Sequence, residues 1–102
     1  MFTDWTPKHP GFRPEMLGFI PGFLDLSDPR PAKEQIHSAY TSGWHSFPGF
    51  EMAPNGDMLY PGDPPTKLLA EAKFRDETLR FYEHAWLAIV QPDGSFEVSR
   101  LD

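Results

Sequence analysis

The chain has 102 residues, of which 15% are aromatic, and it carries a formal net charge of −6 without any cysteine. These totals exclude disulfides and thiolate metal sites, and the acidic balance disfavours a broad basic surface for nucleic acid or anionic membrane. One domain with one modest core is therefore expected.

The N-terminal segment 1–31 is rich in proline, glycine and aromatic side chains, a composition that forbids a long helix or a central strand. We expect 1–18 to form a loosely ordered arm and 19–102 to form one domain. The stretch "MLGFI" (16–20) is a candidate short strand. Four apolar side chains are expected to enter the core: Phe19, Ile20, Phe23 and Leu24. The chain shows no export-signal pattern and no apolar run of about 18 residues, so we expect a cytoplasmic protein without a membrane partner.

The stretch "SDPRPAKEQIHSAYTSG" (27–43) predicts the one helix. Ser27 or Asp28 suits the N-cap, and Gly43 suits the end of the helix. Apolar residues recur at spacings of three and four: Ala32, Ile36, Ala39 and Tyr40. A helix of about ten residues with one narrow apolar stripe is expected, too short to be stable unless it packs on something else.

The stretch "FEMAPNGDMLY" (50–60) predicts a hairpin around Pro54–Gly56. In this hairpin Met52 faces Met58 and Phe50 faces Tyr60. The loop "YPGDPPT" (60–66) follows, and Pro61-Gly62 favours a type II turn.

The last third of the chain admits a helix over 68–86, but alternation of apolar and polar residues favours strands. Turns at Asp76-Glu77, Glu83-His84 and Pro92–Gly94 define a four-strand antiparallel meander. These turns bring apolar residues opposite one another in the pairs Phe74/Leu79, Ala72/Phe81, Phe81/Trp86, Leu79/Ala88, Val90/Phe96 and Ala88/Val98. The predicted fold class is α+β, with one short helix packed on a mostly antiparallel sheet and a further hairpin near 50–60.

This register places an apolar strip on the face of the sheet away from the helix, while Trp86, Ala88, Val90, Phe96 and Val98 lie beneath the helix. The candidate interface on the second face comprises Lys73, Arg75, Arg80, Tyr82, Ala85, Leu87, Ile89, Glu97 and Leu101. An apolar centre with a polar border is typical of a binding surface. Three possibilities remain for what packs over the strip: the arm or the 50–60 hairpin, a second copy of the chain, or a foreign protein.

No catalytic, cofactor-binding or metal-binding residue is assigned. The four histidines, His9, His37, His45 and His84, do not fall in a metal-ligand pattern, and no serine has the context of an activated nucleophile. A small hydrolase-type enzyme is the least favoured alternative. Glu71 and Glu97 share a face with Lys73, Arg75 and Arg80, which disfavours nucleic-acid binding there.

The stretches "FIPGFLDLSDPRPAKEQI", "YPGDPP" and above all "FYEHAWLAIVQPDGSFEVSRLD" resemble a group of short uncharacterised proteins encoded by bacteriophages and prophages of proteobacteria. The resemblance covers about 19–102 and supplies no functional residues. It implies a small accessory protein that binds a host or phage protein. We therefore expect a non-enzymatic interaction protein that works through its sheet surface, with a self-associating structural protein, a homodimer through the same strip, as the alternative.

Overall fold

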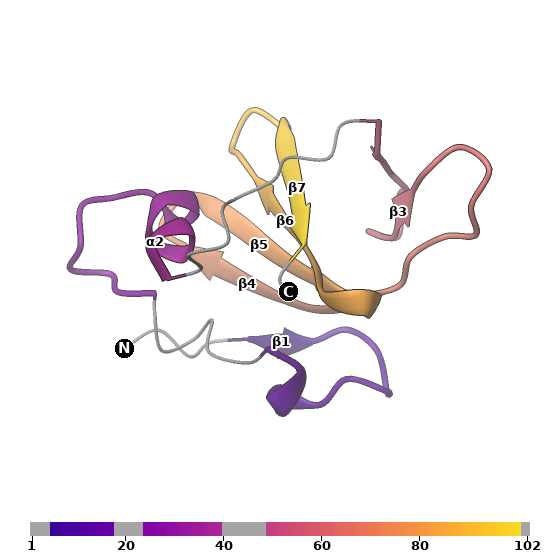
Figure 1. The fold of residues 1–102 in the computed structure, drawn as a ribbon, viewed down its shortest axis with the longest axis horizontal. Coiled ribbons are helices and arrows are strands. Elements are labelled where there is room, and N and C mark those ends of the chain that lie inside the picture. The colour runs from indigo at the N-terminus through magenta and orange to yellow at the C-terminus, as the bar shows by residue number, and fades with distance from the viewer. Residues whose placement is uncertain (1–4, 18–23, 40–48, 101–102) are drawn as a thin grey trace.

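The computed structural model describes residues 5–17, 24–39 and 49–100, and its fold is α+β, as predicted (Figure 1). The elements in chain order are β1 (Thr6–Pro7), η1 (Pro14–Leu17), α2 (Ala32–Ala39), β2 (Glu51–Met52), β3 (Met58–Leu59), β4 (Leu68–Phe74), β5 (Glu77–Tyr82), η2 (Glu83–Ala85), β6 (Trp86–Val90) and β7 (Phe96–Arg100). Among these described residues, no helix is long and apolar enough to cross a membrane.

The main sheet has five antiparallel strands in the order β1-β4-β5-β6-β7, and β2 and β3 form a separate two-stranded sheet. The predicted four-strand meander is confirmed as β4 to β7. The arm adds the fifth strand, because Thr6 pairs with Glu71 and Pro7 with Ala70. The strand predicted for 16–20 is wrong at Met16 and Leu17, because both residues belong to the 3-10 turn η1. Residues 18–20 of that prediction lie outside the described residues.

Helix α2 begins at Ala32, and its N-terminal cap comes from a distant strand. The carboxylate of Glu77 in β5 accepts a hydrogen bond from the Ala32 N–H at 3.1 Å, and its second oxygen accepts one from the Gln91 side chain at 2.9 Å. The predicted caps are wrong because Ser27 and Asp28 are engaged within their own loop. Glu77 is buried, so an anion at the positive end of the helix dipole replaces the local cap.

The 50–60 hairpin is confirmed in its register. Met52 pairs with Met58, and the rings of Phe50 and Tyr60 are in contact just beyond the strands. The turn at Pro61-Gly62 is also as expected, because the N–H of Asp63 donates to the carbonyl of Tyr60 and Gly62 has a φ of 88°.

The β4–β5 turn lies one residue earlier than predicted, which shifts the pairing of the two strands by two residues. Phe74 pairs with Glu77, so the turn consists of Arg75 and Asp76, and Ala72 pairs with Leu79. A shift of two residues leaves every side chain on its predicted face, because side chains alternate with a period of two.

The β5–β6 turn differs by one residue, and this difference changes the faces. The turn η2 has three residues, Glu83–Ala85, in place of the predicted Glu83-His84 pair, and His84 has a φ of 64°. Phe81 consequently pairs with Leu87, whereas the sequence predicted Trp86. A one-residue shift turns β6 and β7 over relative to β4 and β5.

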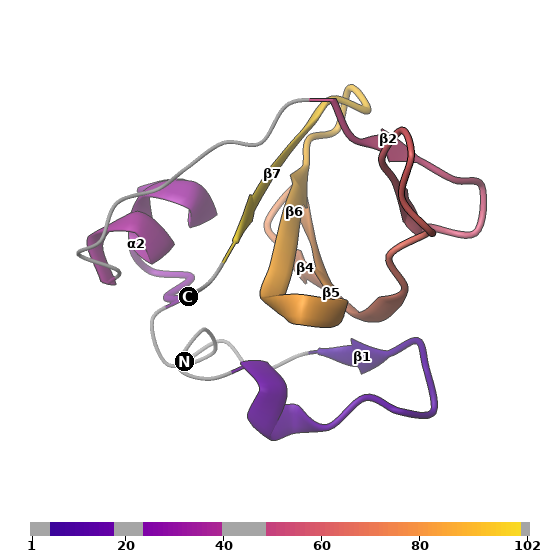
Figure 2. The ribbon, with the colours of Figure 1, turned by 45° about the vertical axis from the view of Figure 1, so that its right-hand side comes forward.

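The sheet is covered on both faces, with α2 on one side and the β2–β3 hairpin on the other (Figure 2). The core on the first face, here called the helix-side core, contains Leu24, Ala32, Ile36, Leu69, Ala72, Phe74, Leu79, Phe81, Leu87 and Ile89. The core on the second face, the hairpin-side core, contains Met58, Leu68, Tyr82, Ala88 and Val98. Leu24 therefore enters the core as predicted, while Phe19, Ile20 and Phe23 lie outside the described residues.

Candidate functional site

Three aromatic side chains form a continuous row at the border between the hairpin and the sheet. Phe50, which precedes β2, lies between Tyr60, which follows β3, and Trp86 at the start of β6. The ring centroids of Phe50 and Tyr60 are 4.9 Å apart with an interplanar angle of 51°, and those of Phe50 and Trp86 are 5.3 Å apart at 57°. Tilted rings at these separations attract one another through their quadrupoles, so the row is held in one arrangement. We call Phe50, Tyr60 and Trp86 the aromatic row.

Local chemistry fixes both ends of the aromatic row. Arg100 pairs with Trp86 across β6 and β7, and its guanidinium carbon lies 5.5 Å from the Trp86 ring centroid, within the range of a cation–π interaction. At the other end, Gly49 has a φ of 98°, and a Cβ there would lie 3.2 Å from the Tyr60 ring. Glycine therefore lets the backbone approach the ring closely.

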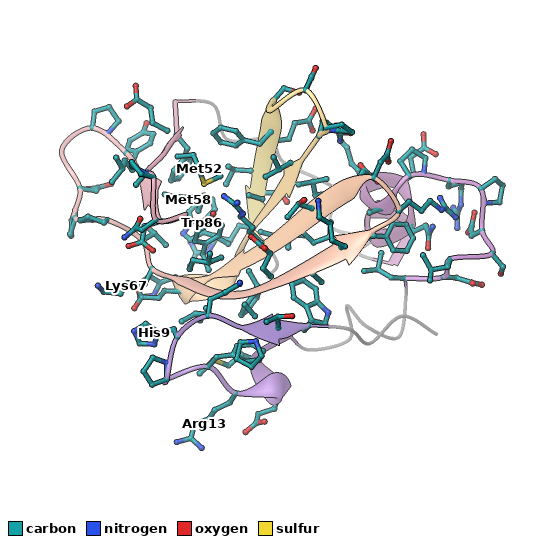
Figure 3. The ribbon with its side chains drawn as sticks, turned by 180° about the vertical axis from the view of Figure 1, so that it is seen from behind. His9, Arg13, Met52, Met58, Lys67 and Trp86 are labelled. Carbon is teal, nitrogen blue, oxygen red and sulfur yellow. The ribbon has the colours of Figure 1, made fainter. Side chains whose placement is uncertain are left out.

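The hairpin that carries two members of the row is anchored to the sheet by Tyr82. The Tyr82 hydroxyl donates to the carbonyl of Gly56 at 2.7 Å and contacts the Met52 sulfur at 3.1 Å. The carboxylate of Asp57 accepts from the Leu68 N–H at 3.0 Å, which ties the hairpin to the start of β4. Figure 3 shows Met52 and Trp86 near one another where the hairpin meets the sheet.

The aromatic row reaches solvent at the edge of the hairpin-side core. Tyr60 is 43% exposed, and Phe50 and Trp86 are half-buried against the hairpin-side core. Trp, Tyr and Arg are the residue types most enriched among the side chains that carry binding energy at protein interfaces. The arrangement of preordered rings beside a guanidinium can therefore bind an apolar or aromatic protein segment with little loss of side-chain entropy.

The predicted strip is part of the helix-side core. Leu87 is 0% exposed and Ile89 2% exposed, so the prediction that they form a free surface is wrong. The physical reason is the three-residue turn η2, which places both side chains beneath α2 beside Leu79. The arm, one of the segments expected to cover this strip, helps to bury it, because Trp5 and Phe12 pack against the same core.

The other residues of the candidate interface do not form one surface. Tyr82 is buried on the hairpin side of the sheet, whereas Glu97 is exposed on the helix side, where its carboxylate lies 2.5 Å from the Lys33 ammonium. Arg80 forms an ion pair with Glu71 at 2.8 Å. Lys73 is exposed, and the side chain of Ala85 and the whole of Leu101 lie outside the described residues.

Arg75 has a structural role in the β4–β5 turn. Its guanidinium donates to the carbonyls of Leu26 at 2.8 Å, Arg30 at 2.9 Å and Asp28. These three bonds hold the loop before α2 against the turn. Arg75 therefore serves the fold in this position and is not available as the rim of an interface.

The described residues hold no group of three or more His, Asp or Glu side chains that could bind a metal ion. The site is therefore a surface of aromatic rings, and sequence reasoning found only part of it. The facing pair Phe50 and Tyr60 was predicted from the hairpin. Trp86 was missed because the predicted register placed it beneath the helix, and the signal that would have found it is the length of the η2 turn.

Comparisons with protein-family models, with curated proteins and with solved structures found no match to this chain. The resemblance to phage and prophage proteins therefore stays a prediction that depends on the three stretches quoted above.

Proposed function

We propose that this protein is a non-enzymatic interaction protein that binds a host or phage protein through the aromatic row. The observation that carries the proposal is the row itself: Phe50 contacts the rings of Tyr60 and Trp86, Tyr60 is 43% exposed, and the guanidinium of Arg100 lies beside Trp86. The phage or prophage setting and the cytoplasmic location expected from the sequence belong to this proposal.

The placement of the aromatic row supports binding at the border of the sheet. The buried apolar clusters on both faces of the sheet already pack against other parts of the chain, so a partner that used either cluster would have to displace α2 or the hairpin. The row needs no such displacement, because its side chains are already exposed or half-exposed. A net charge of −6 favours a basic partner by raising the rate of encounter.

Affinity capture from a lysate of the bacterial host tests the proposal with a pair of matched variants. Tyr60→Ser removes the exposed ring of the row, and Leu26→Ser removes an apolar side chain that is 54% exposed in the loop before α2. We expect wild type and Leu26→Ser to capture the same protein by mass spectrometry, and Tyr60→Ser to lose it while remaining folded, as circular dichroism would show.

The binding constant of the captured protein, once purified, completes the test. We expect Tyr60→Ser to weaken binding by at least about tenfold, which corresponds to about 1.4 kcal/mol. Equal binding of the two variants would contradict the proposal that the aromatic row is the interface.

A further inference from the structure

A cavity of about 480 Å³ lies between the arm, the end of β5 and the η2 turn. Its lining includes His9 and Met16 from the arm, Leu69 and Phe81 from the sheet, and Glu83 and His84 from η2. Figure 3 shows His9 in the loop after β1, near Lys67, which precedes β4. The volume falls in the range of about 300–1,000 Å³ that is typical of small-molecule sites.

The cavity combines an apolar wall with polar groups. Leu69 and Phe81 belong to the helix-side core and present apolar surface to the cavity. Met16 is 43% exposed, and its flexible thioether can adjust to a ligand of irregular shape. Such a wall favours a ligand with an apolar body.

The polar groups at the cavity have fixed hydrogen-bonding character. Glu83 Oε1 accepts from the Lys67 N–H at 2.9 Å, and within the described residues Oε2 has no hydrogen-bond partner. His9 Nδ1 accepts from the Gly11 N–H at 2.9 Å, so the proton of its neutral imidazole is on Nε2. The backbone of His84 is left-handed, at a φ of 64°, a conformation that costs a non-glycine residue free energy and that occurs often at functional sites.

These groups select the charge of the ligand. A carboxylate attracts a cation and repels an anion, and the net charge of −6 acts in the same direction. A metal ion is a poor candidate, because no group of three metal-binding side chains occurs in the described ranges. An organic ammonium ion satisfies both the carboxylate and the apolar wall.

The geometry points to a binding site for a small organic amine. Its ammonium group donates to Glu83 Oε2, and its aromatic or aliphatic body lies against Leu69, Phe81 and Met16. This site is separate from the aromatic row and does not depend on the function proposed for it.

Titration of the ¹⁵N-labelled protein with phenethylamine, followed by amide chemical shifts, tests the inference. Phenylpropionate carries the same ring with the opposite charge, and ethylamine carries the ammonium without the ring. We expect phenethylamine to shift the amides of Leu69, Glu83 and His84 to saturation, and both other compounds to bind at least about tenfold more weakly. Equal binding of phenethylamine and phenylpropionate, or no saturable shift with phenethylamine, would overturn the inference.

A charge-matched pair of variants locates the ammonium group. Glu83→Gln keeps an oxygen that can accept from the Lys67 N–H but removes the negative charge, and Glu51→Gln makes the same change of charge at an exposed position in β2. We expect Glu83→Gln to weaken phenethylamine binding by at least about tenfold and Glu51→Gln to leave it unchanged. If the two variants bind alike, Glu83 is not the ammonium site and the inference fails.

Discussion

At the scale of single residues, Tyr82 links the hairpin to the sheet through a buried hydroxyl. Burial raises the pKa of Tyr82 to about 12, because removal from water disfavours the charged phenolate. The ordinary value, which applies to the unfolded chain, is 10.0. Since the folded pKa is the higher one, the contribution to the free energy of unfolding is complete below about pH 10 and is lost as the pH rises through 12.

Chemical denaturation across the alkaline range tests this role of Tyr82. We expect the free energy of unfolding of wild type to fall by about 2 kcal/mol more than that of Tyr82→Phe between pH 10 and 12, because phenylalanine has no proton to lose. Tyr60→Phe removes an exposed phenol and should follow wild type. If Tyr82→Phe and wild type lose stability in parallel, the hydroxyl is not buried as described.

At the scale of elements, β6 explains why the sequence did not determine the register. The strand reads "WLAIV", apolar on both of its sides, so either set of side chains can face Leu79 and Phe81. Apolar pairs arise in both registers and therefore do not distinguish them. The choice depends on whether η2 has two or three residues, and the left-handed conformation of His84 that permits three is not encoded by a glycine.

Other elements were predictable for local reasons. The hairpin register follows from Pro-Asn-Gly, and the β6–β7 register from Pro-Asp-Gly, because such turns specify the pairing of the strands that they join. The cap of α2 was not predictable, since Glu77 is 45 residues from Ala32 in the chain. The candidate site was predictable only in part. The contact between Phe50 and Tyr60 follows from the local hairpin, whereas the position of Trp86 depends on the length of the η2 turn.

Substitution of Leu87 distinguishes a core strand from a free strip. We expect Leu87→Asp to lower the free energy of unfolding by about 4 kcal/mol or more in chemical denaturation, because it places a charge in a fully buried position. Leu26→Asp makes the same change at a side chain that is 54% exposed and should change stability by no more than about 0.5 kcal/mol. A folded and stable Leu87→Asp protein would mean that Leu87 faces solvent.

The left-handed residue of η2 gives a second prediction at this scale. We expect His84→Gly to raise the free energy of unfolding by about 0.5–1 kcal/mol, because glycine adopts a positive φ without strain. Gly94→Ala is a control that makes the reverse change, from glycine to a residue with a Cβ at a positive φ. Gly94 has a φ of 91°, and an added Cβ would meet nothing within 4 Å. It should lower stability by about 1 kcal/mol through backbone strain alone. A loss of stability in His84→Gly would contradict the three-residue turn.

At the scale of the whole molecule, one chain buries both faces of its sheet. The strip that the sequence offered to a second copy is covered by α2 and the arm within the same chain. We therefore expect light scattering at the highest soluble concentration to give the mass of one chain, 11.7 kDa. A stable dimer at that concentration would contradict this expectation and favour the homodimer alternative.

The aromatic row is proposed as the binding surface because β6 is turned so that Leu87 and Ile89 lie beneath α2. The nuclear Overhauser effects between β5 and β6 measure this register directly. We predict backbone contacts that place Phe81 opposite Leu87 and Leu79 opposite Ile89. Contacts that place Phe81 opposite Trp86 would return the strip to the open face and contradict the account.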